Sequence, residues 1–149
     1  MEANIHIFIQ KMSALTKIDK IEEFFAWYIF DDMPIRSLHF VFDTPTNISL
    51  LVDDYDDNIQ EYVGLELIFK NVWKYHFEYP IETFDFQMIA LYRLRLNKIV
   101  EGKYEIELLI EMPENKEKTC FTVGKMLIAF TDLEVKGGLS QEAIRHKYQ

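Results

Sequence analysis

The sequence has few residues that could support covalent or redox chemistry, and few glycines and prolines, which commonly interrupt helices and strands. It contains one cysteine, Cys120, in 149 residues, so no disulfide can form within the chain. Its five glycines and four prolines are scattered and form no linker. The length fits one globular domain, so we predict a single domain over residues 1–149.

Long apolar runs and positive charge are also scarce. The apolar run at residues 24–30 is far shorter than the ~20 residues that span a bilayer. The N-terminus has an acid at position 2 and no basic segment, so no secretion signal is predicted and a cytoplasmic location is expected. Lysine and arginine total 16 against 25 acidic residues, a net charge of −9. Such a surface repels phosphates and anionic lipids, which excludes nucleic acid and membranes as partners.

Motifs of enzymatic or metal chemistry are missing as well. The sequence has no glycine-rich phosphate loop, no serine elbow and no HExxH helix. Cys120 has no flanking motif of a nucleophile, and the four histidines have no spacing typical of metal ligands. We therefore predict no catalytic residue, no cofactor and no metal site, which favours a function without catalysis.

Hydrophobic periodicity is strong. Apolar residues recur at spacings of three and four up to about Phe30, which predicts an amphipathic helix that Ser13 or Thr16 caps and that ends before Pro34. From Ile35 onward the period is two, with a break at Lys70–Asn71. The predicted fold class is α+β, with an N-terminal helix packed on a largely antiparallel sheet of seven or eight strands, as a sandwich or a half-barrel.

One hairpin can be placed in register from its charges. If residues 98–102 form a five-residue loop, Arg95 faces Glu105 and Arg93 faces Glu107. Opposite charges then meet twice on the polar face, while leucines at 94 and 96 point to the other face.

Two other segments leave alternatives open. The aromatic residues Trp73, Tyr75, Phe77 and Tyr79 share one face of a predicted strand. They either pack in the core against the helix or line a ligand pocket. The tail at residues 137–149 begins with a Gly-Gly break and has few apolar residues, so it is expected either to dock loosely or to be disordered.

The stretch "DDYDD" is the most concentrated group of acids in the chain. Aligned as an EF-hand loop from Asp54, it has Ile59 where glycine is needed and Leu65 where a bidentate acid is needed. We therefore predict a solvated acidic connection between two strands rather than a calcium site. Its carboxylates could instead dock a basic protein, and the candidate contact residues are Asp53, Asp54, Asp56, Asp57 and Glu61.

The order of features resembles a known group of proteins. An acidic turn leads into a strand in "DDMPIRSLHFVFD", and an acidic connection leads into a second strand in "GLELIFKNVWKYHF". This order is similar to that of small acidic bacterial proteins, which include immunity proteins encoded beside polymorphic toxins. The resemblance implies no catalytic residue, and it implies an acidic surface that meets a basic toxin.

Three functional hypotheses follow. The first is a non-enzymatic cytoplasmic binding protein, in the form of an immunity protein that neutralises a basic toxin through its acidic surface. The alternative is a small-ligand binding or enzymatic domain whose pocket is lined by the sheet aromatics. The third is a subunit of a homo-oligomer that associates through the aromatic helix or an edge strand.

Overall fold

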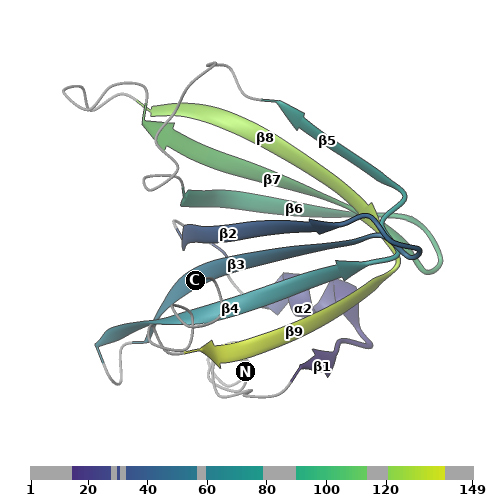
Figure 1. The fold of residues 1–149 in the computed structure, drawn as a ribbon, viewed down its shortest axis with the longest axis horizontal. Coiled ribbons are helices and arrows are strands. Elements are labelled where there is room, and N and C mark those ends of the chain that lie inside the picture. Colours follow the sequence, from purple (N-terminus) through teal and green to yellow (C-terminus); the bar gives the residue numbers. More distant parts are fainter. Residues whose placement is uncertain are drawn as a thin grey trace.

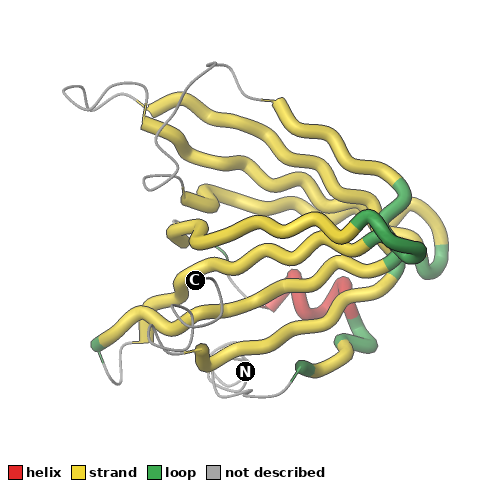
Figure 2. Tube along the Cα trace, in the orientation of Figure 1, coloured by secondary structure: helices red, strands yellow, loops and turns green. Residues whose placement is uncertain are grey.

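The structure, a computed structural model, describes residues 15–27, 30, 33–56, 60–78, 90–113 and 121–139. Within these ranges the chain forms one helix and nine strands (Figures 1 and 2). In chain order they are β1 (Thr16–Lys17), α2 (Ile21–Trp27), β2 (Met33–Val41), β3 (Asn47–Asp56), β4 (Glu61–Lys70), β5 (Lys74–Glu78), β6 (Ala90–Val100), β7 (Lys103–Pro113), β8 (Phe121–Phe130) and β9 (Asp132–Leu139).

All neighbouring strands of the sheet are antiparallel. The strand order is β1-β9-β4-β3-β2-β6-β7-β8-β5. The pairing in the middle of this order is short, because β2 meets β6 only where Met33 and Pro34 pair with Leu91 and Ala90. The strands spread as a fan, with β5 and β1 at its two outer edges and α2 behind β4 and β9 (Figure 1).

The architecture corrects the predicted fold class. The described chain is mostly β, with one short helix and an open sheet, rather than α+β. Helix α2 ends at Trp27, whereas periodicity extended it to about Phe30, and Phe30 is buried but not helical. Thr16 does not cap the helix, because it pairs in β1 with Val135 of β9. An apolar spacing of three and four predicted the helix correctly, but not its length.

One hydrophobic core contains side chains from both halves of the sheet, β9-β4-β3-β2 and β6-β7-β8, and from the helix. Phe69 on β4 meets Phe130 on β8 edge to face, with ring centroids 5.0 Å apart. Ile21 and Phe24 of α2 belong to the same buried cluster. The predicted packing of the helix on the sheet is therefore confirmed, and apolar burial on this face holds the two halves together.

The β4–β5 connection and the β8–β9 connection lie side by side and form a corner of the fold. Asn71 is the first of three residues between β4 and β5, and its φ of 56° is a left-handed conformation that asparagine tolerates better than most residues. Opposite it, Thr131 separates β8 from β9. The Thr131 amide donates to the Lys70 carbonyl at 3.2 Å, and the Trp73 amide donates to the Ala129 carbonyl at 3.1 Å. Backbone pairing thus continues around the corner, and the predicted break at Lys70–Asn71 is confirmed.

The β6–β7 hairpin has the predicted faces but a different register. Arg95 faces Glu107 and Asn97 faces Glu105, two residues away from the prediction. The turn is shorter than expected, because Gly102 takes φ 78° and a bulge lies between Lys98 and Val100. A bulge inserts one extra residue, and the alternation of charges along the sequence does not show where it lies.

The remaining predictions about packing have mixed outcomes. Tyr75 and Phe77 pack against Phe40 of β2, at ring-centroid distances of 5.7 and 5.3 Å, and Phe77 also packs against the buried core that includes Ile21 and Phe24 of the helix. Residues 137–139 of the predicted tail belong to β9. Cys120, Tyr79, Ser13 and residues 140–149 lie outside the described residues, so the predictions about them stay predictions.

Candidate functional site

Residues 53–56 of the acidic stretch lie in a strand and not in a connection. Asp53 and Asp54 continue β3 and pair with Gly64 and Val63 of β4. The ladder runs without a break from Ile48 to Asp56. The prediction of an acidic turn here was wrong, because the apolar alternation of β3 and β4 carries the pairing past the point where acids begin. Aspartate is rare in strands, which is why its presence suggested a turn.

The first two acids of this stretch are also buried. Asp53 is 2% exposed and Asp54 is 7% exposed, so the predicted solvated state is wrong for both. The Arg36 side chain on β2 donates from Nε to Oδ2 of Asp53, which supplies the opposite charge that a buried carboxylate needs. These two residues lack the exposure required of direct contacts to a partner, and the Arg36–Asp53 pair links β2 to β3.

The end of the β3–β4 hairpin presents a different surface. The tyrosines at positions 55 and 62 face each other across the ladder and are 44% and 47% exposed. Their rings lie 5.2 Å apart at an interplanar angle of 69°. Glu61 beside them is exposed and pairs through its backbone with Asp56. We call Tyr55, Glu61 and Tyr62 the tip surface, and the hairpin extends outward from the fan at this end (Figure 1).

Of the five predicted contact residues, therefore, one is placed at the surface. Glu61 belongs to the tip surface, whereas Asp53 and Asp54 are buried below it. Asp56 belongs to β3 by its backbone, and Asp57 lies outside the described residues. Sequence reasoning missed Tyr55 and Tyr62 as contact residues, although extending the strand alternation across the acids would have indicated them.

A second polar feature lies at the corner of the fold. A surface depression of about 250 Å³ is lined by Lys17, Pro45, Lys70, Asn71, Asp132 and Glu134. None of the sheet aromatics proposed for a ligand pocket lines it. Its volume is below the ~300–1,000 Å³ of typical small-molecule sites.

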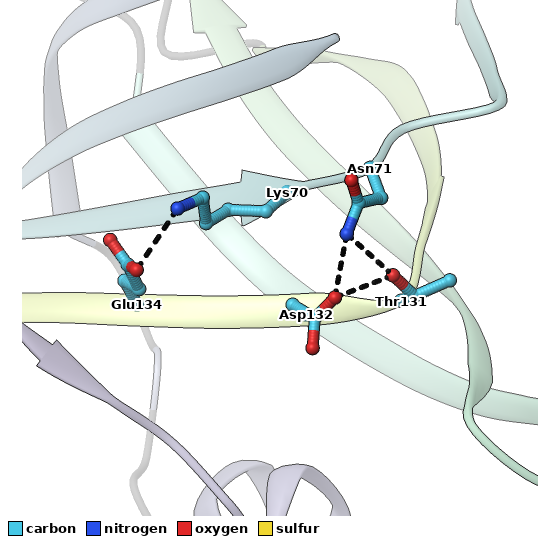
Figure 3. Close-up of polar contacts among 5 residues, drawn as sticks. All are labelled: Lys70, Asn71, Thr131, Asp132 and Glu134. Atoms are coloured by element: carbon cyan, nitrogen blue, oxygen red, sulfur yellow. Dashed lines mark hydrogen bonds and ion pairs between the residues drawn. The ribbon is translucent and has the colours of Figure 1, made fainter. Parts of the chain in front are cut away.

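Four of the six residues that line this depression are bonded to one another in pairs (Figure 3). The Asn71 side-chain amide donates to Oδ2 of Asp132 at 2.7 Å and to Oγ1 of Thr131 at 3.1 Å. The Thr131 hydroxyl donates to the same oxygen of Asp132 at 2.7 Å. Lys70 pairs with Glu134 at 3.0 Å across the β4–β9 ladder. The contacts join residues on both strands of the corner.

The electrostatics of the corner suit structure better than catalysis. The hydrogen bond from Thr131 lowers the pKa of Asp132, and the Asn71 amide and the charges of Lys17 and Lys70 lower it further. A general acid at neutral pH needs a raised carboxyl pKa, which is the opposite shift. Asp132 therefore remains an ionised acceptor that joins β9 to the corner.

Histidines and metal geometry add no catalytic centre to the described part of the chain. His76 on β5 bonds Glu78 at 3.0 Å on an exposed face, and His39 is exposed on β2. Over residues 15–27, 30, 33–56, 60–78, 90–113 and 121–139, no group of three or more His, Cys, Asp or Glu residues could hold a metal ion. The one described helix is too short to cross a membrane.

Comparisons with protein-family models, with curated proteins and with solved structures found no match to this chain. The resemblance to immunity proteins therefore stays a prediction, and the functional argument rests on the geometry of the described residues.

Proposed function

We propose that this chain is a non-enzymatic protein that binds a basic protein partner through the tip surface. The observation that carries the proposal is the pair of half-exposed tyrosines beside Glu61 at the end of an outward-reaching hairpin. An immunity protein that occludes a basic toxin in the cytoplasm is the form of this function that the composition and the resemblance favour.

Tyrosine is suited to such a contact for two reasons. It buries a large area at a low cost in side-chain entropy, and it is enriched among residues that dominate binding energy. Tyr55 and Tyr62 also hold each other edge to face, so part of the ordering cost is met before binding.

The negative charge of the chain favours a basic partner. The chain carries a net charge of −9, and Glu61 adds an exposed carboxylate at the end of β4, on the opposite face of the strand from Tyr62. Complementary charge raises association rates and rejects acidic competitors more than it raises affinity. The predicted role of the acids is thus divided: exposed acids attract the partner, and buried acids hold the hairpin that presents the tyrosines.

A binding measurement with variants tests the proposal. The proposal expects the reading frame next to this gene to encode a basic toxin domain, and that domain is the probe, titrated by calorimetry at 50 and 300 mM NaCl. We expect the double variant Tyr55→Ala/Tyr62→Ala to weaken binding about 100-fold, because each tyrosine of a hot spot contributes a factor of ten or more. We expect Glu61→Gln to reduce the salt dependence of binding while leaving most of the affinity.

Tyr75→Ala is the matched control, since Tyr75 is 46% exposed but lies on β5. It should bind the toxin domain as the unmodified chain does. Equal affinity of the double variant and the unmodified chain would refute the role of the tip surface, and a failure to bind the toxin domain at all would refute the immunity function.

A further inference from the structure

Strand β5 lies at an outer edge of the sheet. Lys74–Glu78 pairs with β8 on one side, and β5 is the last strand of the order over the described part of the chain (Figure 1). An edge strand offers backbone donors and acceptors to another strand, and such edges are used for association. Four of its five residues are exposed.

The sequence of this strand is complementary to itself. Read antiparallel about its central residue, "KYHFE" places Lys74 opposite Glu78, Tyr75 opposite Phe77, and His76 opposite its own copy. We propose that two copies of this chain form a two-fold dimer in which their β5 strands pair antiparallel about His76. A two-fold axis repeats each contact, so two opposite-charge pairs and two aromatic pairs form together.

The two faces of β5 support the same register. Tyr75 and Phe77 lie on the face of the aromatic cluster, with Phe40 of β2 and Phe42 just after it within 5.3–6.0 Å. Pairing would continue this cluster across the axis. Lys74 and Glu78 lie on the opposite face, where alternation places every second residue. Lysine on an edge strand normally discourages pairing, and here Glu78 of the second copy would neutralise it.

The other edge of the sheet lacks these properties. Strand β1 has two residues, Thr16 and Lys17, and a lysine paired with a threonine offers no charge complement. Self-association is therefore assigned to β5. Five paired residues a side bury less than the ~1,200 Å² of a standard interface, so we expect a dissociation constant in the micromolar range.

Charge reversal tests the proposed register. Sedimentation equilibrium from 1 to 500 µM should show dimers of the unmodified chain. Lys74→Glu and Glu78→Lys should each weaken dimerisation at least about fivefold, since each places like charges opposite one another twice. The double variant Lys74→Glu/Glu78→Lys restores opposite charges and should restore the dimer. Lys74→Glu leaves the His76–Glu78 contact intact, so it separates the dimer effect from any local change caused by Glu78→Lys.

A cross-link tests the axis directly. In a Cys120→Ser background, His76→Cys should form an intermolecular disulfide on mild oxidation, because residues opposite each other in an antiparallel ladder lie ~4.5–5.5 Å apart between Cα atoms. Val100→Cys, on the exposed end of β6, is the control and should cross-link far more slowly. A monomer at 500 µM, or a dimer unaffected by both single charge reversals, would overturn the proposal. Tyr55→Ala/Tyr62→Ala should dimerise normally, so this test does not depend on the proposed partner.

Discussion

Two hairpins of this protein carry rows of charges, and they use them differently. In β3–β4 the charges Asp53, Asp54 and Glu66 are buried, and Asp53 is paired with Arg36. In β6–β7 the charges stand on a face open to water, as at Arg95, which is exposed and faces Glu107. The same residue types therefore serve a structural purpose in one hairpin and a solubilising one in the other.

The difference arises from burial and not from local sequence. A carboxylate out of water is costly unless an opposite charge or hydrogen bonds compensate for it, whereas a charge in water needs no partner. Substitutions at the buried pair should therefore cost more stability than substitutions at exposed charges.

The largest effect is expected at the buried pair. Arg36→Ala removes the Nε donor of Asp53, whose side chain is 1% exposed, and should lower the free energy of unfolding by about 2–3 kcal/mol. Urea unfolding followed by circular dichroism measures this. Arg95→Ala on β6 is the matched control and should change stability by less than about 0.5 kcal/mol. Equal effects of the two substitutions would remove the contrast between the hairpins.

An intermediate effect is expected at the corner, where Asp132 accepts two hydrogen bonds at 2.7 Å. Asp132→Asn should lower stability by about 1 kcal/mol at pH 7. Because its folded pKa is depressed below the usual 3.8, the stabilisation is present above that value and is lost as pH falls through the folded pKa. The difference between the two proteins should therefore be constant from pH 5 to 8 and shrink below about pH 4.

Thermal unfolding at several pH values checks this dependence, with Asp43→Asn, an exposed acid, as the control. A difference that stays constant down to pH 2.5 would show that the Asp132 carboxylate does not hold the corner through its charge.

The smallest effect is expected at Lys98, which pairs with Glu22 of α2 at 3.2 Å and with Glu101 of the β6–β7 turn at 2.8 Å. The hydrogen bond with Glu101, then that with Glu22, raises the pKa of Lys98 to about 12, so the ammonium stays charged over the whole working range. Lys98→Met should shift the melting temperature by no more than about 1 °C, and 1 M NaCl should abolish the shift. A salt-independent shift of several degrees would contradict the solvated character of this hairpin.

Much of the sheet could be predicted from the sequence, because alternation of apolar residues survives burial on one face. The strands from Ile35 to Lys70, the break at Asn71 and the faces of the β6–β7 hairpin were predicted correctly, whereas the boundary between the last two strands lies at Thr131 and not at Gly124. The fold class was not predicted correctly. An apolar stripe at helical spacing indicates that a helix is present, but it does not show how short the helix is relative to the sheet.

The candidate site was predicted less well, for a physical reason. Whether Asp53 is solvated depends on Arg36, which lies 17 residues away and meets it only in the folded chain. Local composition pointed to a turn, since aspartates favour turns. Only the ladder between β3 and β4 shows that β3 continues past Asp53. The same ladder places Tyr55 of β3 and Tyr62 of β4 beyond Asp53, where both are exposed.

Amide hydrogen exchange of β3, followed residue by residue by NMR, tests this account most directly. Consecutive residues of a strand alternate between its two neighbours, so one of Asp53 and Asp54 directs its amide to β4. We predict that this amide exchanges orders of magnitude more slowly than an unstructured amide, as the ladder from Ile48 to Asp56 requires. Exchange of both amides at unstructured rates would contradict the account and return the acidic stretch to a solvated turn.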